Sequence, residues 1–162
     1  MALTTEQLAT LKAAILADPV LAAFPAGSDG SYAIAAELNK PAAPEFVVWK
    51  TSVSVDEIMR NGMDWTRVDN LTVGKSRIWD WMSRLGSFNP SKVNIRAGID
   101  AAWVGTAADL AVRATVYTHC KRAATVVEKL FASGGAGTTA DPATLTFEGA
   151  ISWQTVDAAR NS

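Results

Sequence analysis

Apolar residues recur at intervals of three and four along most of the first 132 positions, which predicts a mainly α-helical fold. Leu8, Leu11 and Ile15 form the first such stripe after the capping box Thr4-Thr-Glu-Gln7, and Asp18-Pro19 ends it. Frequent pairs of alanine support helices, because alanine loses no side-chain entropy in a helix. Later helices are predicted to begin near Ser31, Ser54, Thr72 and Asn89.

The longest predicted helix covers residues 107–132. Thr106 and Asp109 suit the start of a helix, and apolar residues continue at helical spacing from Leu110 to Phe131. At 1.5 Å per residue such a helix would span roughly 39 Å. The expected fold is therefore mainly α, a helical bundle around one long central helix, with a short extended or β segment elsewhere.

Two other segments break the helical pattern. Residues 43–53 include a short, β-branched apolar run, and the pattern leaves open whether they form a strand or coil. Residues 133–142 have the glycine-rich composition of a linker. We therefore expect a helical body over residues 1–132 and a linker with a flexible C-terminal arm over 133–162. Its apolar anchors, which must be buried on the body or on a neighbour, are Leu145, Phe147, Ile151 and Trp153.

The composition of the chain excludes several classes of protein. The chain has 162 residues and 49% hydrophobic residues, enough for a sizeable core, and a net charge of −1 argues against a strongly cationic nucleic-acid binder. One cysteine and one histidine exclude an internal disulfide and any site built from several cysteines or histidines. The N-terminus does not resemble a targeting signal and no apolar run is long enough for a membrane span, so we expect synthesis in the cytoplasm and no membrane partner.

Charge is unevenly distributed along the chain. Residues 71–132 hold 9 basic and 4 acidic residues, whereas residues 1–70 hold 5 basic and 9 acidic residues. The basic block suits either a surface that faces DNA or one that contacts an acidic neighbouring subunit, and ion pairing within the chain is the simpler alternative. The candidate contact residues are Lys75, Arg77, Arg84, Lys92, Arg96, Arg113, Lys121 and Arg122.

The sequence contains parts of known catalytic motifs but no complete one. Gly74-Lys75-Ser76 resembles part of a phosphate-binding loop, but Asp69 stands where that pattern requires a glycine. His119 and Cys120 are adjacent on the predicted helix, so their side chains point about 100° apart and do not form a dyad. We therefore predict no catalytic, cofactor-binding or metal-binding residues.

Six tryptophans are a high count for this length. Trp79 and Trp81 fall on different faces of one predicted helix, so a single neighbour cannot cover both. Because tryptophan is enriched at the centres of protein interfaces, Trp65, Trp81 and Trp153 are candidates for contact with another chain.

Residues 11–19, 64–82, 94–132 and 145–160 together resemble a family of small structural proteins of tailed bacteriophages and prophages. The helical body with an arm resembles a head–tail adaptor, or connector, in particular. The resemblance implies a virion component that forms a ring of twelve subunits and contacts the portal protein, a tail or tail-completion protein and, without sequence preference, packaged DNA.

Other functions remain open at this point. A capsid decoration protein and a tail-completion or tail-tube component are the alternatives within the virion. A small phage enzyme lacks a recognisable set of catalytic residues, and a helix-turn-helix regulator lacks a strongly basic recognition helix. On the adaptor hypothesis, deletion of residues 133–162 would leave a folded monomer that no longer joins the portal.

Overall fold

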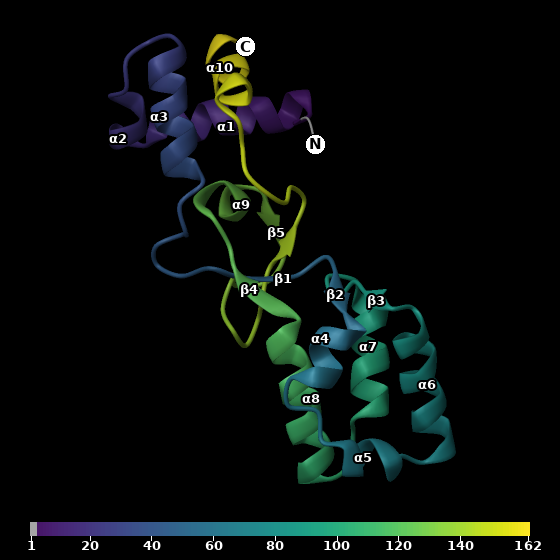
Figure 1. Cartoon of the computed structure of the whole chain (residues 1–162). Coiled ribbons are helices and arrows are strands. Elements are labelled where there is room, and N and C mark those ends of the chain that lie inside the picture. The colour runs from purple at the N-terminus through teal and green to yellow at the C-terminus, as the bar shows by residue number, and fades with distance from the viewer. Residues whose placement is uncertain (1–2) are drawn as a thin grey trace. The chain divides into compact units, whose positions relative to one another are not determined.

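The computed structural model describes residues 3–162. Over these residues the fold is mainly helical, with ten helices and 55% of the chain in helix, joined by a few short strands. The chain divides into two compact units. We call residues 3–48 with 123–162 the terminal unit and residues 49–122 the central unit (Figure 1). This division differs from the expected boundary at residue 132.

The terminal unit is built from both ends of the chain. Its helices are α1 (Thr5–Ala17), α2 (Pro19–Ala22), α3 (Ser28–Leu38), α9 (Val126–Leu130) and α10 (Trp153–Asn161). The last helix packs on α3 and on α1, as Figure 1 shows with α10 in yellow. Side chains from all five helices form its core, which includes Leu11, Leu21, Ile34, Leu38, Val127, Phe131, Phe147, Ile151 and Val156.

Short strands complete the terminal unit. β5 (Ala132–Ser133) and β6 (Thr144–Leu145) pair antiparallel around the glycine-rich loop. Within that loop Gly137 has a φ of 70°, and a Cβ there would lie 2.0 Å from the Phe46 ring. Only glycine fits this position without a shift, because it has no Cβ and adopts positive φ freely. The loop is therefore fastened to its own unit.

The central unit contains α4 (Val55–Arg60), α5 (Trp65–Asp69), α6 (Val73–Arg84), α7 (Val93–Ala102) and α8 (Ala107–His119). Strands β2 (Val53–Ser54) and β3 (Ser87–Phe88) pair antiparallel. α6 and α7 pack closely, and Trp79 and Trp103 meet edge to face with ring centroids 5.2 Å apart. Both tryptophans are buried in a core with Val53, Ile58, Phe88, Ile99, Val112 and Val116.

The long central helix is not confirmed, and the structure corrects it. α8 ends at His119, strand β4 (Lys121–Ala123) follows, and α9 begins at Val126. The Lys50 amide donates to the Cys120 carbonyl at 2.9 Å, and the Ala124 amide donates to the Phe46 carbonyl at 2.8 Å. These backbone hydrogen bonds require an extended chain after α8, and β4 accordingly pairs with β1 (Val47–Trp49). The open segment 43–53 therefore includes strand residues.

The C-terminal arm is also not confirmed as a flexible element. Residues 133–162 form β5 in part, β6 and α10, and they belong to the terminal unit. Asn39 fastens the segment at Ile151: its side chain donates to the Ile151 carbonyl at 2.9 Å and accepts from the Ile151 amide at 2.8 Å. The segment expected as a flexible arm is therefore an integral part of the terminal unit.

Candidate functional site

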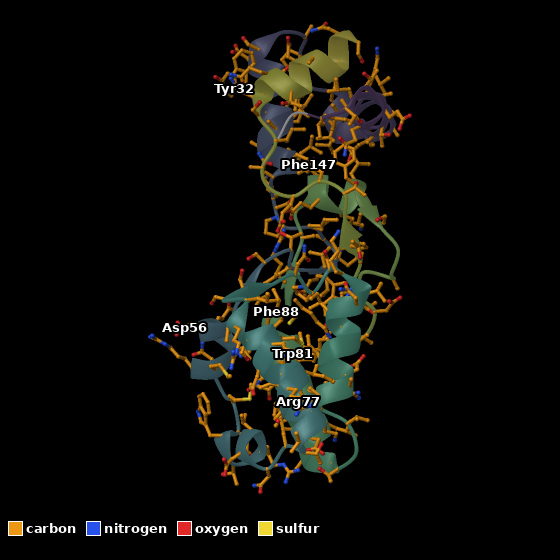
Figure 2. The ribbon with its side chains drawn as sticks, turned by 90° about the vertical axis from the view of Figure 1, so that its right-hand side faces the viewer. Tyr32, Asp56, Arg77, Trp81, Phe88 and Phe147 are labelled. Carbon is orange, nitrogen blue, oxygen red and sulfur yellow. The ribbon has the colours of Figure 1, made fainter. Side chains whose placement is uncertain are left out.

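α6 exposes one face that no other described residue covers. The helix buries Trp79 and Met82, whereas Val73, Arg77, Trp81 and Leu85, each four positions after the last, are exposed. Trp81 is 67% exposed, and Figure 2 shows it with Arg77 on this helix. Because residues four apart lie on neighbouring turns, these side chains form one continuous stripe. We call this stripe, together with Arg84 of α6 and with the exposed Lys92 and Val93 at the start of α7, the α6 face.

Three cations of the α6 face have no partner within residues 3–162. Arg77 and Arg84 flank Trp81 on α6, and Lys92 precedes α7, which packs on α6. All three side chains are exposed and make no hydrogen bond or ion pair in the described part of the chain. One acidic residue, Asp80, is exposed on the same helix. Tryptophan and arginine are the residues that contribute most often to interface hot spots, so this composition suits contact with another molecule.

The other predicted basic residues have roles within the central unit. The Arg96 guanidinium donates to the Pro90 carbonyl at 2.7 Å and lies 4.9 Å from the Trp49 ring. Arg113 forms an ion pair with Asp100 at 3.5 Å. Lys75 contacts the Val104 carbonyl and Asp109, Lys121 lies over Trp49, and Arg122 is partly buried. The eight residues therefore do not form the single basic surface considered from the sequence.

Trp65 is also exposed, at 59%, but on a different pair of helices. It begins α5, which packs on α8, whereas Trp81 lies on α6, which packs on α7. Contact between either tryptophan and another chain stays a prediction.

The four predicted arm anchors lie within the terminal unit. Phe147 is buried against Phe131, with ring centroids 5.7 Å apart, and Ile151 is buried in the same core. Trp153 stacks on Tyr32 at 4.9 Å between centroids, and Leu145 packs on the cluster around Val48 and Ala143. Figure 2 labels Tyr32 and Phe147 in this unit. Their apolar surface is thus used largely inside the chain.

His119 and Cys120 have different surroundings. His119 Nε2 lies 2.8 Å from the Asn61 carbonyl oxygen, and its Nδ1 lies 3.7 Å from Glu57. Cys120 is fully buried, and burial raises the pKa of its thiol to about 12. A thiol with this pKa is almost entirely protonated at neutral pH and is a weak nucleophile.

Asp109 joins α5 to α8. Its carboxylate accepts a hydrogen bond from Arg67 at 2.7 Å and caps its own helix by accepting from the Thr106 amide at 3.2 Å. These contacts, with the Arg67 hydrogen bond the largest, lower the pKa of Asp109 to about 2. The ion pair has a structural role, because it fixes α5 on α8.

Replacement of this carboxylate is expected to remove a pH-dependent part of the stability. The folded pKa lies below the ordinary value of 3.8, so the contribution is present above about pH 4 and is lost as the pH falls towards 2. The variant Asp109→Asn should melt several degrees below the wild type at pH 7, and the difference should shrink towards pH 2. Thermal unfolding followed by circular dichroism measures this. The control Asp80→Asn, at an exposed position, should melt close to the wild type at pH 7. A difference for Asp109→Asn that stays constant with pH would contradict the assignment.

A second surface feature lies on the terminal unit. A groove of about 440 Å³ runs along α1, and its lining is mostly apolar. Leu16, which is 68% exposed, stands at one end of it. This groove was not predicted from the sequence, because Leu16 follows Ile15 directly and falls outside the buried stripe of α1. The lining residues are Thr5, Leu8, Ala9, Lys12, Ala13, Leu16 and Ser162.

Two kinds of feature are absent from residues 3–162. No group of three or more histidine, cysteine, aspartate or glutamate residues is placed to hold a metal ion. None of the helices described there combines the length and the apolar character that crossing a membrane requires.

Comparison of the chain with protein-family models, curated proteins and solved structures found no match.

Proposed function

We propose that this chain is a non-enzymatic assembly protein of the virion of a tailed bacteriophage, and that it acts as a head–tail adaptor in a ring between portal and tail. Two lines of support lead to this proposal. The first is the resemblance of four stretches of the sequence to small phage structural proteins. The second is the α6 face, where exposed Trp81 lies between two arginines that have no partner in residues 3–162.

The α6 face carries the proposal because it has the composition of an interface and its cations have no partner within residues 3–162. A large exposed indole is unfavourable in water, and burying an aromatic side chain gains roughly 2–3 kcal/mol. Arginines beside it add planar, weakly hydrated charges that suit carboxylates or phosphates. In a ring, these arginines would face an acidic neighbour or the DNA channel. Contact with the portal and the tail would then use the central unit rather than a flexible arm.

Electron microscopy of particles made by a phage that lacks this gene tests the function. An adaptor joins head to tail, so we expect separate tails beside heads that have lost their DNA, and restoration of complete particles by the wild-type gene in trans. Complementation with the control variant Leu110→Ala, at an exposed position of α8, should restore them equally. Tailed particles with fragile heads would favour a decoration protein instead, and normal particles would contradict any essential role in assembly.

A further inference from the structure

The two structural units carry opposite charge. Residues 1–48 and 123–162 hold 4 basic and 9 acidic residues, whereas residues 49–122 hold 11 basic and 7 acidic residues. The net charges are −5 and +4, although the whole chain is nearly neutral. Separation of charge at this scale favours contact between unlike units of different molecules, since complementary potentials steer association and like potentials oppose it.

Each unit also carries one exposed apolar surface. On the terminal unit, Ala9 and Ala13 leave space along α1 between Leu8 and Leu16, which gives the apolar groove. Val20, at the start of α2, adds exposed apolar surface close in sequence to Leu16. On the central unit the corresponding surface is the α6 face, with Trp81 as its largest side chain.

Exposed charges at the two ends of α1 differ in sign from those of the α6 face. Glu6 is exposed in the first turn of α1, and Asp18 is exposed where α1 ends and α2 begins. The groove's own cation, Lys12, donates a hydrogen bond to the Ser162 carbonyl. The α6 face presents Arg77, Arg84 and Lys92 against the single carboxylate of Asp80. An aromatic, cationic face and an apolar groove on a unit of net negative charge are chemically complementary.

We propose that the α6 face of one copy of this chain docks on the α1 groove of a second copy, with Trp81 seated against Leu8, Ala13 and Leu16. This inference rests on the proposed assembly function and names its self-contact. The two surfaces belong to different units, so the contact is heterologous and each added copy presents a further groove or face. A symmetric contact between two α6 faces is disfavoured, because Arg77, Arg84 and Lys92 would meet their own copies.

Sedimentation velocity of the full-length chain tests the docking. The wild type should self-associate, more weakly as salt is raised. Trp81→Ala removes the aromatic side chain, and Leu16→Arg places a cation in the groove at the C-terminal end of a helix, where a cation does not destabilise the helix. Each variant alone should associate at least about 30-fold more weakly than the wild type, the loss expected at a hot spot. The matched controls Leu110→Ala, on α8, and Ala36→Arg, on α3, should associate as the wild type does.

A mixture of the two variants is the decisive sample. Trp81→Ala keeps an intact groove and Leu16→Arg keeps an intact α6 face, so the mixture should form a one-to-one dimer that does not grow. Failure of the mixture to dimerise, wild-type association by either variant, or a monomeric wild type at every concentration would overturn the docking. The microscopy of mutant particles is independent: complete particles without the gene would remove the adaptor function and leave a measured self-contact intact.

Discussion

Removal of residues 133–162 is expected to unfold the terminal unit and to leave the central unit folded. The deletion removes Phe147, Ile151 and Val156 from the core, and it uncovers their partners on α1 and α3. Burial of one such side chain contributes roughly 2 kcal/mol, so about 6 kcal/mol is lost from these three alone. Native domains are stable by only about 5–15 kcal/mol. An independent arm could be deleted without unfolding residues 1–132. The structure predicts the opposite, that the terminal unit unfolds.

Hydrogen exchange measured by mass spectrometry separates these outcomes within one sample. Peptides from α1 and α3 should lose their protection in the truncated chain, because local opening then costs little free energy. Peptides from α6 and α8 serve as the internal control and should exchange as slowly as in the full chain. Native protection in α1 and α3 after truncation would show that the C-terminal segment is a removable arm.

The second large effect is expected for Trp103→Ala in the central unit. Trp103 is completely buried and meets Trp79 edge to face. Neither indole nitrogen has a hydrogen-bond partner in the described chain, so both rings contribute by packing. Truncation of a large buried aromatic residue to alanine costs about 3–5 kcal/mol, which is a large part of the stability of a unit of this size.

Three tryptophan variants make this a matched comparison. Trp103→Ala should lower the protection of α6, α7 and α8 strongly, whereas Trp81→Ala and Trp65→Ala should change it within about 0.5 kcal/mol, because both side chains are exposed. Hydrogen exchange is the suitable readout here too, since a chain of two units need not unfold in one step. Equal effects from Trp81 and Trp103 would contradict the described packing of α6.

Local signals in the sequence predicted several helix starts correctly, but α3 begins at Ser28 rather than near Ser31, and the N-cap of α7 is Lys92 rather than Asn89. The Thr4 and Gln7 capping box is present at α1, Ser54 caps α4, and Thr106 with Asp109 caps α8. These positions are predictable because a cap depends on the chemistry of four adjacent residues and hardly on distant ones. The mainly helical character of the fold followed from the same local patterns.

The break after His119 was not predicted, because its cause lies far away in sequence. Apolar residues continue at helical spacing through Cys120–Ala124, and only pairing with residues 46–50 requires extended backbone there. One local signal could have shown it: Thr125 and Glu128 form a capping box, which marks a new helix start inside the expected helix. The arm was misjudged for a similar reason, since its packing partners on α1 and α3 lie more than a hundred residues away.

The candidate site was only partly predictable. Opposite faces of one helix placed Trp79 and Trp81 in different environments, and the structure has one buried and the other exposed. Of the eight basic residues, only Arg77, Arg84 and Lys92 fall on the α6 face, because partners for residues such as Arg96 and Arg113 depend on tertiary packing. Six of the seven residues that line the groove belong to α1, but the seventh, Ser162, comes from the other end of the chain, and its place there depends on tertiary packing.

The number of copies of this chain in purified virions tests the central claim most directly. Quantitative mass spectrometry against an isotope-labelled standard, with the major capsid protein as internal reference, measures it. A ring at the head–tail junction predicts about a dozen copies per complete particle. The chain should be missing from isolated heads that never received a tail-joining complex. Hundreds of copies would contradict the adaptor and indicate decoration of the capsid, and absence of the chain from the particle would contradict every structural role in the virion.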